Sequence, residues 1–87
     1  MLDFGTFEFE GKNYIAIEDA QPTGRELDGV NYNDAEEGEE YSFEMACRAK
    51  GEDGNMYMLY WVFTDVRGEE KDYDAYYYDE VNSVEEL

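Results

Sequence analysis

The sequence predicts a single, mainly β domain over residues 1–87, an antiparallel sheet of about five strands made of an N-terminal hairpin and a C-terminal three-stranded meander; an α+β fold is the alternative. Polar and apolar residues alternate in several segments, and this period of two residues is typical of strands. Short segments rich in Gly and Asn separate the alternating runs at hairpin spacing. Aromatic residues, which strands favour, make up 17% of the chain and supply enough apolar surface for one core.

The first expected element is a hairpin over residues 6–19. Phenylalanine alternates with glutamate in its first half, and isoleucine recurs at alternate positions in its second half. The segment Gly11-Lys12-Asn13 between the halves supplies residues that tolerate positive φ, as a tight turn requires. The side chains expected on one shared face are Phe7, Phe9, Ile15 and Ile17.

Residues 21–40 are expected to be mostly loop, because Pro22, several glycines and several asparagines interrupt the pattern. A connection this long inside a small domain usually contains some structure of its own. A helical turn at Arg25–Leu27 and a short strand at Val30–Tyr32 both remain open as interpretations of this segment.

The meander begins with the most regular alternation in the chain, over residues 41–50. Its apolar face is expected to contain Tyr41, Phe43, Met45, Cys47 and Ala49. Residues 51–55 form the expected hairpin loop, and Met56–Val66 follows with apolar residues on both faces, which is typical of a central strand. The third strand is expected at Tyr73–Asp79. Ser83–Glu86 resembles a helix-capping box, but only Leu87 follows it, so a frayed turn is expected there.

Charge is the main guide to function. The chain contains 24 Asp and Glu against 6 Lys and Arg, a formal net charge of −18. Nucleic-acid affinity depends largely on Lys and Arg, so direct binding to DNA, RNA or an anionic membrane is not expected. The aromatic content allows the chain to fold, which would hold the carboxylates in fixed positions. We therefore expect a basic protein as the partner.

Several classes of site are excluded or disfavoured. The chain has no histidine, which rules out Ser-His-Asp and Cys-His catalysis and zinc sites that use histidine. The acids lack the order of a calcium-binding loop, so no metal or cofactor is expected, and an enzyme is the least expected class. Arg25, Arg48 and Arg67 are expected to serve as internal ion-pair partners.

The only cysteine, Cys47, excludes an intramolecular disulfide and favours a reducing compartment. Its position on the apolar face of residues 41–50 predicts a core residue rather than a nucleophile. The sequence contains no apolar run long enough for a transmembrane helix and no signal-peptide pattern at its start. We expect a soluble protein in the cytoplasm of a bacterial host cell.

Two patches are predicted to bind the partner. Carboxylates spaced along strands lie at distances comparable to those between nucleic-acid phosphates, and exposed tyrosines add cation–π contacts to Arg and Lys. The main acidic and aromatic patch comprises Glu69, Glu70, Asp72, Asp74, Tyr76, Tyr78, Asp79 and Glu80. The second acidic patch comprises Glu36, Glu37, Glu39 and Glu40. Self-association into a homodimer is the other use such a patch allows.

In size, charge, sheet-forming aromatics and acid clusters, the chain resembles the small acidic proteins that phages and mobile elements use against host defences, namely anti-CRISPR proteins and antirestriction DNA mimics. The clusters that carry this resemblance lie at Glu36–Glu40, Glu69–Asp74 and Asp79–Glu86. It implies stoichiometric binding to a basic nucleic-acid-binding protein, such as a CRISPR effector or restriction enzyme, whose nucleic-acid site is blocked. The alternatives are an immunity protein or antitoxin against a basic nuclease toxin, and an acidic scaffold protein of a halophile.

Overall fold

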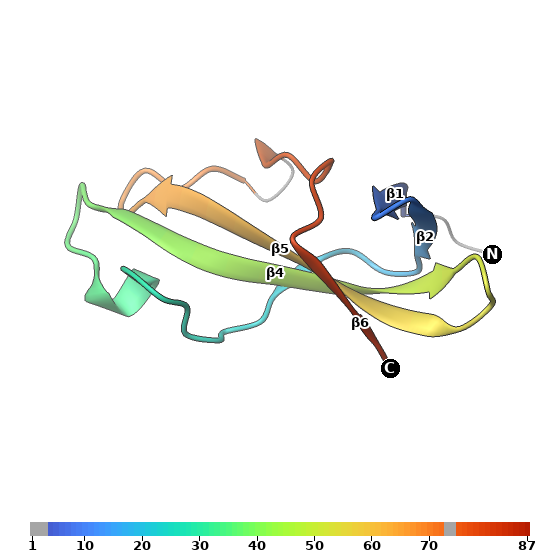
Figure 1. Cartoon of the computed structure of the whole chain (residues 1–87). Coiled ribbons are helices and arrows are strands. Elements are labelled where there is room, and N and C mark those ends of the chain that lie inside the picture. The colour runs from blue at the N-terminus through green and yellow to red at the C-terminus, as the bar shows by residue number, and fades with distance from the viewer. Residues whose placement is uncertain (1–3, 73–74) are drawn as a thin grey trace.

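The computed structural model describes residues 4–72 and 75–87 and confirms the mainly β class, with a single antiparallel open sheet and no α-helix in those ranges. The strands are β1 (Thr6–Phe9), β2 (Lys12–Ala16), β3 (Gln21–Pro22), β4 (Glu40–Gly51), β5 (Met56–Val66) and β6 (Ser83–Glu86), and the 3₁₀ helix η1 spans Tyr32–Asp34. The order across the sheet is β1-β2-β4-β5-β6, the strands labelled in Figure 1. The short strand β3 pairs with β4 on the same edge as β2.

The β4–β5 hairpin forms the frame of the molecule. Its pairs run from Glu40 opposite Val66 to Lys50 opposite Met56, and the described chain measures 43 × 22 × 19 Å. Gly54 adopts a φ of 85° in the turn, where the Gly51 amide donates to the Asn55 carbonyl at 2.9 Å. Both long strands and the loop between them therefore match the prediction from the sequence.

The core lies on one face of this hairpin, which we call the inner face. Its β4 side chains are the five predicted ones, and Met45, Cys47 and Ala49 are at most 1% exposed. Leu59 and Trp61 of β5 lie opposite Cys47 and Met45 and are equally buried. The segment after β5 and the β1–β2 hairpin both pack against this face, and residues 20–34 run along the other side of the hairpin (Figure 1).

The N-terminal hairpin forms, but the predicted shared face is wrong. Phe7 pairs with Tyr14, so the phenylalanines share their face with buried Tyr14 and Ala16, whereas Ile15 points to the other side. The turn consists of Glu10 and Gly11, at φ of 52° and 79°, instead of the three residues expected. Positive φ at both central positions is typical of the two-residue type I′ turn, and a shift of one residue in register exchanges the two faces of a strand.

Residues 21–40 are mostly loop, as predicted. The helical turn is η1, which begins at Tyr32 rather than at Arg25. Between β3 and β4, the described structure has one extended pairing, a single parallel bridge between Asn31 and Ser42. Beside it, the Ser42 amide donates to the Val30 carbonyl at 2.9 Å.

The meander is present, but its third strand lies later than expected. Of the predicted strand Tyr73–Asp79, residues 75–79 form turns over the inner face, and Tyr73 and Asp74 lie outside the described residues. The third strand is β6, in the segment where a frayed turn was expected. Three consecutive tyrosines, 76–78, break the two-residue alternation that a half-buried strand requires. Ser83–Glu86 keeps that alternation, because Val84 lies opposite Leu59 and packs against the core.

Candidate functional site

Two acidic segments that are distant in sequence meet at one end of the β4–β5 hairpin. The Gly38 amide donates to the Arg67 carbonyl at 2.8 Å, and the Arg67 amide donates to the Glu39 carbonyl at 3.0 Å. Exposed carboxylates project from both segments, and we call them together the acidic tip: Glu36, Glu37, Glu39, Glu40, Glu69, Glu70 and Asp72. The second predicted patch and part of the main one are thus a single surface.

Local turns hold the acidic tip in shape. Gly38 and Gly68 adopt φ of 87° and 92°, a region that favours glycine. A Cβ added to Gly68 would lie 3.1 Å from the Glu37 side chain, which shows that the two segments are in contact. The Gly68 amide also donates to Glu70 at 3.1 Å, and the Glu36 amide donates to Glu39 at 3.2 Å.

The arginine nearest to the acidic tip is directed away from its carboxylates. Arg67 donates through Nη1 to the carbonyls of Tyr32 and Ala35, at 3.0 and 2.6 Å, and its guanidinium lies 4.6 Å from the Tyr32 ring centroid. Ion pairs within residues 4–72 and 75–87 join Arg25 to Glu44, Arg48 to Glu18 and Lys71 to Asp65. No carboxylate of the acidic tip therefore has an ion-pair partner in that part of the chain.

Glu44 is one of two buried carboxylates in the part of the chain that the structure describes, and it anchors the loop that follows β3. It lies on the face of β4 opposite the core, where Arg25 Nε and Nη2 approach it at 2.6 and 2.8 Å and the Thr23 hydroxyl donates to it at 2.9 Å. The bond from Arg25 is the main reason that the pKa of Glu44 lies below its usual value. The sequence prediction of internal ion pairs is confirmed for Arg25 and Arg48, while Arg67 contacts carbonyls instead.

Asp65, the other buried carboxylate, anchors the segment after β5. It accepts hydrogen bonds from the Tyr76 hydroxyl and from the amides of Lys71 and Val66, the latter two at 2.9 and 2.8 Å. Lys71 Nζ lies 4.0 Å from it. These donors, Tyr76 first, hold the pKa of Asp65 below its usual value. The loop that carries Glu70 and Asp72 is thereby fastened to the sheet.

Tyr76 and Tyr78 are not the exposed aromatics that the sequence suggested. Tyr76 stacks on Phe63 with centroids 5.1 Å apart, and Tyr78 packs edge-on against Trp61 at 5.2 Å. The Tyr78 carbonyl also accepts a hydrogen bond from Trp61 Nε1 at 3.0 Å. Tyr77 is the exposed one, at 83%. Because this segment is not a strand, its side chains do not alternate, and two tyrosines cover the inner face.

The remaining members of the main predicted patch lie apart from the acidic tip or outside the described residues. Asp79 and Glu80 are exposed, but they follow Tyr78, which is fixed to Trp61. Trp61 lies about 17 Å along β5 from Val66, at the strand rise of roughly 3.3 Å per residue. Asp74 falls in the undescribed stretch. The structure therefore groups Glu69, Glu70 and Asp72 with the second patch.

Cys47 occupies the inner face, as predicted, and is 1% exposed. Burial raises the pKa of its thiol to about 12, which opposes the thiolate form that a nucleophile needs. Within the described residues, no group of three or more His, Cys, Asp or Glu side chains is arranged to hold a metal ion. The same residues include no helix with the length and apolar character that crossing a membrane requires.

Comparisons with protein-family models, with curated proteins and with solved structures found no match to this chain.

Proposed function

We propose that the protein is a stoichiometric inhibitor of the phage type, anti-CRISPR or antirestriction, that covers a basic nucleic-acid-binding surface of a host defence protein. The observation that carries the proposal is the acidic tip, in which two segments place seven exposed carboxylates at one end of the hairpin. The tip takes the place of nucleic-acid phosphates on the target, and nucleic acid and inhibitor exclude one another.

The geometry of the acidic tip supports this role. Residues 36–39 form a tight turn, in which the Glu39 amide donates to the Glu36 carbonyl at 2.8 Å and Gly38 has a φ of 87°, so the carboxylates of this segment project from one short turn. Residues 69–72 place a second group of acids beside this turn. Two adjacent groups of negative charge present a stronger local field to a basic surface than a single run of acids does.

The distribution of the basic residues also supports it. Arg25, Arg48 and Arg67 are used in internal contacts, which fix loops and leave the charge of the acidic tip uncompensated. A fixed field of one sign accelerates the encounter with a basic surface and makes the association sensitive to salt. The backbone turns that carry the carboxylates are already ordered before binding, so the ordering entropy lost when the complex forms is mainly that of the side chains.

Capture on immobilised protein tests this proposal with matched charge variants. The tip variant carries Glu36→Gln, Glu37→Gln, Glu39→Gln, Glu69→Gln and Glu70→Gln. The control variant has the same net charge and carries Glu8→Gln, Glu10→Gln, Asp19→Asn, Glu85→Gln and Glu86→Gln, all at exposed or edge positions outside the tip. Bacterial lysate is passed over each, and retained proteins are eluted first with duplex DNA and then with a salt gradient.

The proposal predicts nucleic-acid-binding proteins that DNA releases from the wild-type protein and from the control variant, but that the tip variant fails to retain. Purified target should then lose DNA binding at a one-to-one ratio of inhibitor. Equal loss of binding in both variants would show that total charge, not the acidic tip, is responsible, and the proposal would fail. A nuclease toxin as the retained protein would instead identify an immunity protein.

A further inference from the structure

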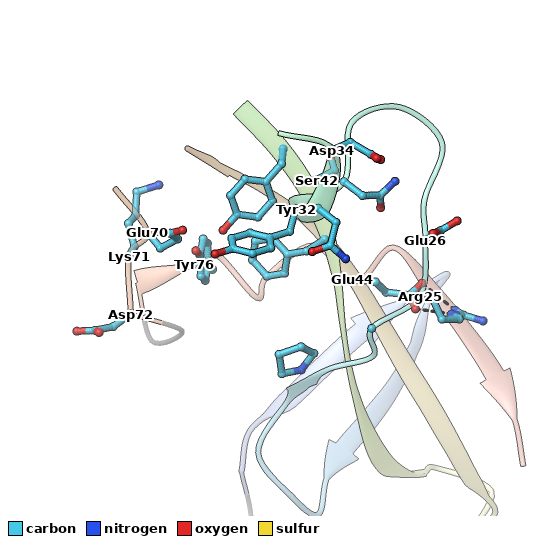
Figure 2. Close-up of a pocket in the computed structure, with 16 residues that line it drawn as sticks. Arg25, Glu26, Tyr32, Asp34, Ser42, Glu44, Glu70, Lys71, Asp72 and Tyr76 are labelled. Atoms are coloured by element: carbon cyan, nitrogen blue, oxygen red, sulfur yellow. Dashed lines mark hydrogen bonds and ion pairs between the residues drawn. The ribbon is translucent and has the colours of Figure 1, made fainter. Parts of the chain in front are cut away.

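A pocket of about 640 Å³ lies next to the acidic tip. It opens along residues 41–44 of β4, between the loop of residues 22–34 on one side and residues 70–72 and 76 on the other. Figure 2 shows Glu70, Lys71 and Asp72 on one side of the pocket and Arg25 and Glu26 on the other. Its volume is in the range of sites that bind small ligands or single side chains.

Aromatic rings form a continuous wall of this pocket. Tyr32 meets Tyr41 edge-on with centroids 5.2 Å apart, Tyr41 is 6.0 Å from Phe43, and Phe43 meets Tyr76 at 5.2 Å. Tyr32 is 46% exposed, so part of this wall is accessible from outside. The face of an aromatic ring carries partial negative charge and attracts cations.

The charges around the pocket are predominantly negative. Arg25 is neutralised by its two bonds to Glu44, one from Nε and one from Nη2. The lining residues that remain charged are Glu26, Asp34, Glu70 and Asp72, against Lys71 alone. These carboxylates come from two separate segments that border the pocket. Aromatic faces bordered by carboxylates favour an organic cation over an anion or a neutral molecule.

Two of the rings already lie next to cations of this chain. The guanidinium of Arg67 is 4.6 Å from the centroid of Tyr32, and Lys71 Nζ is 5.6 Å from that of Tyr76. Arg67 does not line the pocket, so it contacts Tyr32 from outside it. Both rings thus already contact a cation of this chain, and the basic residues that line the pocket are Lys71 and Arg25, of which Arg25 is paired with Glu44.

We propose that the pocket receives the guanidinium of an arginine side chain from the basic partner, an inference that rests on the proposed function and specifies the group recognised beside the acidic tip. A guanidinium is planar, weakly hydrated and able to bind a carboxylate through two parallel hydrogen bonds while it stacks on a ring. An ammonium is compact and strongly hydrated, and it uses such a site less well. The pocket thus adds selectivity for arginine to the general attraction of the acidic tip.

The test uses a small probe and needs no partner protein. Nα-acetyl-arginine amide is titrated into the isotope-labelled full chain, and the aromatic signals of Tyr32 and Phe43 are followed by NMR. We expect saturable shifts with a dissociation constant in roughly the millimolar range, the scale of one or two cation–π and ion-pair contacts. Nα-acetyl-citrulline amide, a neutral isostere, should produce no such shifts, and Nα-acetyl-lysine amide should bind several times more weakly.

Charge variants show whether the pocket binds a cation or an anion. Lys71→Gln should tighten binding of the arginine probe by about threefold, the effect in water of removing a like charge about 6 Å away. Asp72→Asn should weaken it, and Lys50→Gln, at the far end of β4, should leave it unchanged. Weaker binding in Lys71→Gln, or saturable binding of inorganic phosphate at the same signals, would overturn the proposal in favour of an anion site. Equal binding of the lysine probe would remove the selectivity for arginine.

These outcomes are separate from those of the capture experiment. If the arginine probe binds but no DNA-binding protein is retained, the proposed function fails while the pocket stands. If targets are retained through the acidic tip but the probe does not bind, the pocket proposal fails alone.

Discussion

Arg25 binds Glu44 through two nitrogen atoms, with Nε 2.6 Å from Oε1 and Nη2 2.8 Å from Oε2, on the face of β4 opposite the core. The Glu44 side chain is 6% exposed and the Arg25 side chain 58%. A carboxylate in the middle of a sheet thus fixes a loop that has almost no secondary structure of its own. In a chain with so many acids, this one is structural.

Glu44→Gln should destabilise the fold by about 1 to 2 kcal/mol, because it replaces a charged acceptor that three donors bind; the exposed side of the pair is screened by solvent, which limits the effect. Denaturant unfolding of both proteins measures the difference. Glu40→Gln, on the same strand but exposed, is the control and should not be destabilised. Equal stability of wild type and Glu44→Gln would show that the pair does not hold the loop.

The free energy of unfolding should fall as the pH drops below about 4, the ordinary range of carboxyl pKa values. The pKa values of Glu44 and Asp65 are lowered in the fold, so their contribution is complete above the unfolded values and is lost as the pH falls through the folded ones. Because Tyr76 is the main cause at Asp65, Tyr76→Phe should reduce this acid-dependent loss. Denaturant curves over a pH series in high salt, which screens general repulsion, provide the measurement. An unchanged pH dependence in Tyr76→Phe would contradict the assignment.

Tyr78→Ala should cost about 2 kcal/mol of stability, since the ring packs on Trp61 and Phe63. Tyr77→Ala is the matched control and should stay within about 0.5 kcal/mol of wild type, because Tyr77 projects into solvent. The Trp61 fluorescence should shift to longer wavelength only in Tyr78→Ala. If Tyr77→Ala lost more stability than Tyr78→Ala, the packing of Tyr78 on Trp61 and Phe63 would be contradicted.

Replacing Glu37 and Glu69 together by Gln should raise the melting temperature by about 2 °C at low salt, because the two segments of the acidic tip repel one another. The gain should shrink in high salt, where the Debye length falls to about 3 Å. Glu8→Gln with Glu86→Gln has the same charge and should gain less. A wild-type protein that unfolds when salt is removed would favour the halophile alternative.

Cys47 should be unreactive toward a thiol reagent at pH about 8 in the native protein, because the thiol is buried and its pKa is raised to about 12. In denaturant, one thiol per chain should react. Stoichiometric labelling of the native state at the rate of a free thiol would mean that this part of the core opens readily.

The regular alternation of residues 41–66 was sufficient to predict the β4–β5 hairpin, its loop and its inner face. Those boundaries also imply the acidic tip, because a register with Lys50 opposite Met56 places Glu40 opposite Val66. The segments on either side of this last pair must then be neighbours. They were predicted as two patches because the two segments are far apart in the sequence and the pairing between β4 and β5 was not used to place them together.

The remaining differences arise where a single residue or a long-range contact decides the outcome. One residue in the turn at Glu10 and Gly11 determines which face Tyr14 and Ile15 occupy. The conformation of residues 75–79 depends on Asp65, because its hydrogen bond with Tyr76 holds that segment over the core. Neither the turn type nor such a tertiary hydrogen bond is visible in a pattern of polar and apolar residues.

The β4–β5 hairpin has a consequence for how the chain acquires its structure. Its two strands are joined by a loop of only residues 52–55, so their contacts close with little loss of loop entropy, whereas β2 and β6 pair with this hairpin across much longer stretches of chain. We expect the β4–β5 hairpin to form early in folding, and the β1–β2 hairpin and β6 to dock on it later. Amides in the middle of β4 and β5 should then exchange with solvent most slowly, and those of β1 and β6 should exchange first.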